Sequence, residues 1–81
     1  MLLVEEFDEA FLGVVHRSGK ESIAAYDYDE CIQHVVKTRH LTFEEALDWF
    51  EVYVISVNVG DNSPVFLEIK TMGEVIRDYG H

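Results

Sequence analysis

Thr42-Phe-Glu-Glu-Ala-Leu-Asp-Trp-Phe-Glu-Val-Tyr-Val-Ile-Ser-Val-Asn-Val59 decides the fold, because this stretch holds the only tryptophan and much of the apolar mass. Thr42 and Glu45 form the pattern of a capping box, in which a hydroxyl and a carboxylate each satisfy a backbone N–H of the first helical turn. At about 100° per residue, apolar side chains fall on one arc and acids opposite. We therefore predict a central helix over about residues 43–57. Its apolar arc consists of Phe43, Ala46, Leu47, Trp49, Phe50, Tyr53, Val54 and Val57, and its acidic side of Glu44, Asp48 and Glu51.

The end of this stretch fits a helix less well than its beginning. Val52 and Ile55 fall on the acidic side, and the β-branched run also suits a strand. The alternative is therefore a strand over residues 52–59. The turn Gly60-Asp-Asn-Ser-Pro64 would then close a hairpin onto a strand near residues 65–69.

The segments on either side of the central helix have their own signals. Residues 11–17 and 22–26 are short apolar runs separated by a Ser-Gly turn, which predicts a β-hairpin. Gly13 inside the first strand indicates either a bulge or a close approach of another backbone. Asp27 is placed to cap a helix over about residues 28–38. Thr71 and Glu74 repeat the capping box before a short closing helix over residues 71–79.

The predicted class is α+β in one domain, residues 1–81. A small antiparallel sheet, made of the N-terminal hairpin and a strand near residues 65–69, packs against the helices at about 28–38 and 43–57. Hydrophobic residues make up 48% of the chain, enough for a folded core. One cysteine excludes an internal disulfide framework, and no leader or long apolar run marks export or a membrane span. We expect a cytoplasmic protein with no membrane contact.

Charge is the strongest bulk signal. Sixteen acids against six bases give a formal net charge of −10, so direct binding to nucleic acid is not expected. No lysine or arginine lies between Arg39 and Lys70. The middle of the chain therefore lacks counter-charges of its own.

The only combination of reactive side chains is Cys31 with His34 and His40. Two ligands at i and i+3 share a helix face, but a closed zinc site needs four. Asp27 and neighbouring acids disfavour a Cys31 thiolate, which a nucleophile requires. We predict no catalytic residues, no metal, no cofactor and no enzyme activity.

The acidic row is the candidate binding feature. Glu44, Asp48 and Glu51 stand about 5 to 6 Å apart along the helix axis, similar to the phosphate step of a nucleic-acid strand. Helix caps and dipoles explain many other acids of the chain but not Asp48 and Glu51. A second acidic patch lies near the N-terminus and consists of Glu5, Glu6, Asp8 and Glu9.

An apolar surface is the competing candidate. Val52 and Ile55, on the outer side of a helix, need cover from another element or a second chain. We therefore predict a homodimer or a partner-binding face formed by Trp49, Val52, Tyr53 and Ile55.

Three motifs resemble a group of small acidic proteins of phages and prophages. They are Tyr26-Asp-Tyr-Asp-Glu-Cys-Ile32, Leu41-Thr-Phe-Glu-Glu-Ala-Leu-Asp-Trp-Phe50 and Val59-Gly-Asp-Asn-Ser-Pro-Val-Phe66. Many small acidic phage proteins inhibit host defence by occupying the nucleic-acid channel of a nuclease. The resemblance implies an anti-CRISPR or anti-restriction protein whose partner is a host nucleic-acid-binding protein, either a CRISPR effector or a restriction nuclease. The alternative is an interaction or phage-assembly module that binds through its apolar surface, with acidity serving solubility.

Overall fold

Two antiparallel strands, β1 (Phe11–Arg17) and β2 (Lys20–Asp27), begin the fold in the computed structural model, which describes residues 1–80. They form the predicted hairpin, and Gly19 at its turn has a positive φ of 72°. The pairing register shifts between Phe11 and Gly13, where Gly13 has a φ of 153°. Of the two alternatives for Gly13, the bulge is therefore confirmed, and it sits where only glycine is comfortable.

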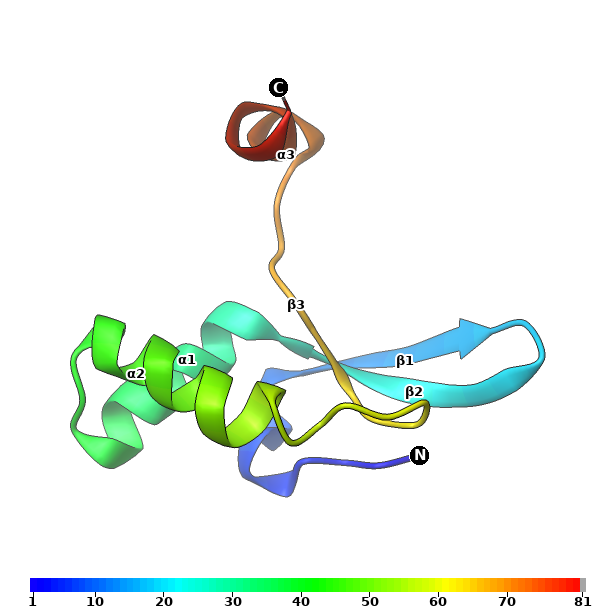
Figure 1. The fold of residues 1–81 in the computed structure, drawn as a ribbon, viewed down its shortest axis with the longest axis horizontal. Coiled ribbons are helices and arrows are strands. Elements are labelled where there is room, and N and C mark those ends of the chain that lie inside the picture. Colours follow the sequence, from blue (N-terminus) through cyan, green and yellow to red (C-terminus); the bar gives the residue numbers. More distant parts are fainter. Residues whose placement is uncertain (81) are drawn as a thin grey trace.

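Two helices follow the hairpin and pack against each other (Figure 1). In α1 (Tyr28–Arg39), the Asp27 carboxylate accepts a hydrogen bond from the Glu30 backbone N–H at 3.1 Å. In α2 (Phe43–Phe50), the Thr42 hydroxyl and the Glu45 carboxylate make both bonds of the capping box, at 3.2 and 2.9 Å. These side chains set where both helices begin, as the sequence predicts.

The central helix continues beyond Phe50 as a wider π-helical segment, η2 (Glu51–Ile55). The backbone N–H of Ser56 bonds to the carbonyl of Glu51 at 3.0 Å, five residues back. The strand alternative for residues 52–59 is therefore wrong. A π-turn advances by less than 100° per residue, so the predicted arc fails at its end: Tyr53 and Val57 are exposed, whereas Val54 is buried.

The third strand, β3 (Val65–Leu67), pairs with β2 in the parallel direction. The α+β class is confirmed, but the sheet is mixed, with the order β1-β2-β3, and not antiparallel throughout. The reason is that α1 and α2 form a crossover between β2 and β3, and strands joined by a helical crossover run parallel. The strand also ends at Leu67, short of the predicted residue 69.

The core lies between the sheet, the two helices and a short 3₁₀ helix, η1 (Glu5–Ala10). Phe50 is fully buried, and its ring makes edge contacts with Phe7, Tyr28 and Phe66 at centroid distances of 5.1 to 5.6 Å. Such edge-to-face pairs suit aromatic quadrupoles. The central stretch thus supplies the middle of the core.

The closing helix, α3 (Met72–Tyr79), stands apart from the other elements at the end of an extended link (Figure 1). Its capping box of Thr71 and Glu74 is formed, as predicted. None of its residues is buried. Packing within one chain therefore leaves this helix without cover.

Candidate binding surface

The acidic row of α2 is fully on the surface. Glu44, Asp48 and Glu51 are all exposed, and Glu51 keeps α-helical backbone angles, with φ −59° and ψ −45°. The row therefore retains its helical spacing up to the start of η2. Within residues 1–80, no lysine, arginine or histidine forms an ion pair with any acid of α2 or with Glu51.

A shallow aromatic cavity borders this row. Its volume is about 300 Å³, and it is lined by Leu41, Glu45, Asp48, Trp49, Val52 and Tyr53. The rings of Trp49 and Tyr53 lie 5.1 Å apart at an angle of 42°. We call the acidic row together with this cavity the α2 surface. It presents carboxylates beside apolar and aromatic side chains.

Arg39 fixes the orientation of Trp49. Its guanidinium carbon lies 3.9 Å from the centre of the Trp49 ring, within the range of a cation–π contact. Trp49 is half-buried, whereas Tyr53 is 61% exposed. Tyr53 is therefore the more available aromatic side chain for a partner.

Residues 52 and 55, predicted to need outside cover, have different environments. Val52 is 55% exposed, but Ile55 is half-buried and packs against the core. The wide turn of η2 brings Ile55 toward the protein interior. A homodimer through Trp49, Val52, Tyr53 and Ile55 stays a prediction.

The N-terminal acidic patch is divided by the fold. Glu6 accepts hydrogen bonds from the Arg39 guanidinium at 2.6 and 3.2 Å and lies 3.3 Å from Nε2 of His34. The bond from Arg39 is the main cause that holds the pKa of Glu6 below its usual value. Glu6 thus ties η1 to α1, while Glu5, Asp8 and Glu9 remain exposed.

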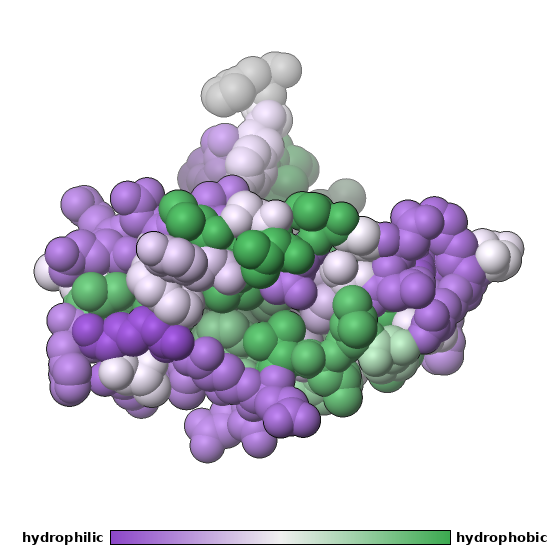
Figure 2. All heavy atoms as spheres, turned by 60° about the horizontal axis from the view of Figure 1, so that its bottom comes forward, coloured by the Kyte–Doolittle hydropathy of each residue, from purple (hydrophilic) through white to green (hydrophobic). Residues whose placement is uncertain are grey.

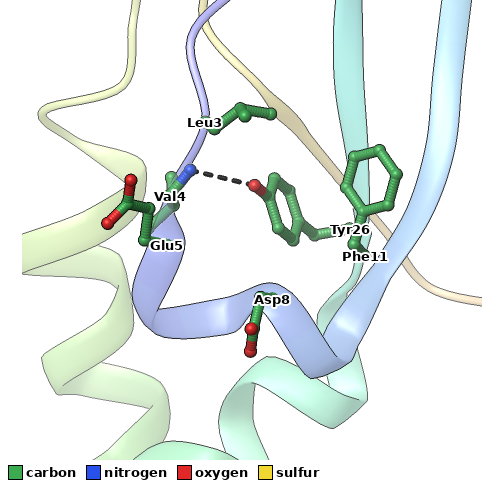
Figure 3. A pocket seen from close by; sticks show the side chains of 6 residues that line it. All are labelled: Leu3, Val4, Glu5, Asp8, Phe11 and Tyr26. Carbon is green, nitrogen blue, oxygen red and sulfur yellow. Dashed lines mark hydrogen bonds between the residues drawn. The ribbon is translucent and has the colours of Figure 1, made fainter.

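A larger cavity lies beside η1, with a volume of about 500 Å³ (Figure 3). Its walls are Leu3, Val4, Phe11 and Tyr26, with Glu5 and Asp8 at the side of η1. The Tyr26 hydroxyl accepts a hydrogen bond from the Val4 backbone N–H at 2.9 Å. This bond holds the N-terminal segment over the cavity.

The candidate nucleophile is inaccessible. Cys31 is 0% exposed, and burial, followed by the charges of Asp27 and Glu30, raises its pKa to about 12. A thiol with this pKa stays protonated at neutral pH and cannot attack a substrate. His34 of α1 contacts η1: its Nε2 lies 3.3 Å from Glu6, and its ring makes an edge contact with Phe7.

Two further searches concern residues 1–80 only. No group of three or more histidine, cysteine or acidic side chains in this part of the chain is placed to hold a metal ion. No helix among the described residues is long and apolar enough to cross a membrane.

Comparison of the chain with protein-family models, with curated proteins and with solved structures found no match. The resemblance to small acidic phage proteins therefore stays a prediction.

Sequence reasoning missed the two cavities and the contacts of Arg39. Arg39 and Glu6 are separated by 33 positions in the chain, and no local pattern links them. One signal was present for the aromatic cavity: Trp49 and Tyr53 are spaced i, i+4, so their rings share a helix face.

Proposed function

We propose that this chain is a non-catalytic inhibitor that places its α2 surface on a basic, nucleic-acid-binding site of a host-defence protein. A CRISPR effector or a restriction nuclease is the expected type of target. The observation that carries the proposal is the exposed row of Glu44, Asp48 and Glu51, which forms no ion pair with any other residue among residues 1–80.

Electrostatics supports this use of the row. Carboxylates at i, i+4 and i+7 repel one another by a few tenths of a kcal/mol per pair. Lysine and arginine side chains that line a nucleic-acid site would remove this repulsion and gain charge-assisted hydrogen bonds. Binding of this kind excludes nucleic acid from the same site by occupying it.

The aromatic cavity adds specificity to the charge. Tyrosine is enriched at interface hot spots, and an arginine side chain can stack on its ring while its guanidinium meets a carboxylate. Tyr53 lines the cavity together with Glu45 and Asp48. A basic side chain of the partner would therefore find both contacts in one place.

The proposal is tested with two variants of equal charge. The first carries Glu44→Gln, Asp48→Asn and Glu51→Gln, and the control carries Asp29→Asn, Glu30→Gln and Asp61→Asn. Each removes three carboxylates, which changes the formal net charge from −10 to −7. Both also lose acids at a helix start, so their thermal stabilities should be similar.

Wild type and variants are immobilised, and a bacterial lysate is passed over them and eluted in steps of increasing salt. We expect wild type and control to retain a nucleic-acid-binding protein that moderate salt releases, because screening weakens contacts between exposed charges. The α2 variant should lose at least ten-fold in affinity for that protein. The isolated complex should no longer bind a labelled DNA or RNA duplex. When this chain is titrated into its target, nucleic-acid binding should be fully lost at one chain per binding site.

Equal retention by the α2 variant and the control would refute the use of the acidic row. Simultaneous binding of nucleic acid and of this chain would refute occlusion.

The aromatic cavity favours a second candidate, an interaction module that binds through apolar contacts. In that case, the Tyr53→Ala variant should lose binding, since Tyr53 is exposed and contributes little to folding. The partner would then resist elution by salt. Retention of the partner by Tyr53→Ala, with release by salt, excludes this candidate.

A further inference from the structure

The C-terminal arm, residues 68–80, carries an apolar face that none of the described residues covers. Along α3, Met72, Val75, Ile76 and Tyr79 recur at helical spacing, and Met72 and Ile76 are 82% and 62% exposed. Ile69, in the link before the helix, is also exposed. An isolated helix of this length is marginal in water and depends on packing of its apolar face.

All ion pairs and side-chain hydrogen bonds of the described arm residues are made within the arm. Lys70 pairs with Glu68 at 3.6 Å and with Asp78 at 3.2 Å, and it lies 5.0 Å from the centre of the Tyr79 ring. These contacts hold the link against α3 and give the arm a defined shape. The arm is therefore preorganised but undocked.

The protein is more open than a folded chain of its size. Its radius of gyration is 13.8 Å, against about 12 Å expected for this length. Its accessible surface is 5771 Å², against about 5,000 Å² expected for a monomer of 9.4 kDa. The excess, about 700 to 800 Å², is close to what one partner buries in a standard protein–protein interface.

The same chain offers a surface that fits such a helix. The cavity beside η1 is lined by Leu3, Phe11 and Tyr26. Leu12 and Val14, which follow Phe11 on β1, are exposed. β1 is an edge strand of the sheet. Figure 2 shows hydrophobic side chains gathered across the middle of one face, between hydrophilic ends. We call the exposed residues Leu3, Phe11, Leu12 and Val14 the N-terminal apolar surface.

Charge permits this contact. The arm has two bases, Lys70 and Arg77, and three acids, a net charge of −1, so residues 1–67 carry the other −9 of the total of −10. The arm thus carries little of the chain's negative charge and adds little repulsion when it meets a second acidic copy. In Figure 3 the carboxylates of Glu5 and Asp8 point away from the Tyr26 ring, which leaves the apolar wall accessible.

We propose that two copies exchange their arms, so that α3 of each chain packs its apolar stripe on the N-terminal apolar surface of the other. When each of two chains receives the arm of the other, the contact is made twice around a two-fold axis and the assembly closes. Only Glu68–Thr71 connects β3 to α3, and in Figure 1 this link leads away from the sheet. Short hinges of this kind favour exchange between chains over folding back.

Light scattering after size exclusion tests the assembly. Wild type should have twice the chain mass of 9.4 kDa, and Ile76→Asp and Leu3→Asp should each halve the measured mass. The control Val59→Asp changes a residue that is 76% exposed outside both surfaces and should remain a dimer. Circular dichroism should show folded protein in all cases, because Ile76 is not part of the core. A wild-type mass of one chain, a mass above two chains, or a dimeric Ile76→Asp variant would overturn the proposal.

Cross-linking distinguishes exchange from folding back. The variant Leu3→Cys/Ile76→Cys is treated with a bismaleimide, while native Cys31 is fully buried and does not compete. Exchange predicts a two-chain band on a denaturing gel, and the control Val57→Cys/Ile76→Cys predicts none. A one-chain product cross-linked within itself would overturn exchange. The α2 surface takes no part in this contact, so this inference and the proposed function can fail separately.

Discussion

Arg39 connects three separate parts of the protein through one side chain. Its guanidinium donates to Glu6 of η1 and to the Thr38 hydroxyl, and it stacks on Trp49 of α2. A planar guanidinium can do both, since its edges carry the donors and its faces stay free for stacking. The ion pair between Arg39 and Glu6 holds η1 against the helices. The stacking of Arg39 on Trp49 positions the indole ring, which lines the aromatic cavity.

This pair predicts a pH-dependent stability. The pKa of Glu6 lies below its usual value of 4.5, so its carboxylate stabilises the fold above about pH 4.5 and loses that effect as pH falls through the lowered pKa. Glu6→Gln should therefore lower the free energy of unfolding by up to about 1 kcal/mol at about pH 7, as for other partly exposed pairs. The difference from wild type should shrink at about pH 3 in urea titrations. Glu9→Gln serves as the control, and a loss that persists at acid pH would contradict this role.

At the scale of elements, α2 combines a start fixed by local chemistry with an end fixed by packing. The capping box begins the helix at Phe43, and its carboxylates follow on the solvent side. At the other end, η2 widens and lets Val54 and Ile55 reach the core, and the Asn58 side chain then donates to the carbonyl of Val54 at 2.7 Å. The acidic row thus ends where the backbone changes its winding.

The capping box should be measurable by itself. Thr42→Ala removes the hydroxyl that accepts from the Glu45 backbone N–H and should cost about 1 kcal/mol of unfolding free energy. Thr42→Ser keeps this hydroxyl and should cost only a few tenths of a kcal/mol. Urea unfolding followed by tryptophan fluorescence compares the two. Equal losses for both variants would show that the methyl group, and not the cap, matters.

At the scale of the whole molecule, a small aromatic core holds the sheet and helices together, while the C-terminal arm adds nothing to that core. Phe7, Tyr26 and Phe50 are the largest buried side chains, and they come from η1, β2 and α2. A chain of this length is stable by only about 4 to 12 kcal/mol. The burial of each of these aromatic rings therefore contributes a large part of the free energy of unfolding.

Phe50→Ala should cost about 3 to 5 kcal/mol, because it removes a fully buried ring that touches three other aromatic side chains. Phe43→Ala, on the same helix, should change the free energy of unfolding by about 0.5 kcal/mol or less, since Phe43 is 49% exposed. Thermal unfolding measures both. A similar loss for the two variants would mean that Phe43 is covered in solution by another chain.

The candidate binding surface could be predicted in part. Glu44, Asp48 and Glu51 lie on the solvent side because helix periodicity alone opposes them to Ala46 and Phe50. The aromatic cavity and the use of Glu6 by Arg39 could not be predicted, since both depend on side chains brought together by the fold. The carboxylates of the acidic row are thus exposed without an ion pair among the described residues, whereas in the N-terminal patch Glu6 alone is paired within the protein.

The sequence by itself determined the local structure: the hairpin with its bulge at Gly13, the capped starts of α1, α2 and α3, and the exposed acidic row. These features depend on hydrogen bonds and periodicities among residues a few positions apart. Only the tertiary structure decided the parallel direction of β3, the π-helical end of the central helix, the cavity at Tyr26 and the undocked arm. The first three depend on contacts between distant residues, where packing of the whole chain outweighs local preference, and the arm is undocked because its apolar face makes no such contact within the described chain.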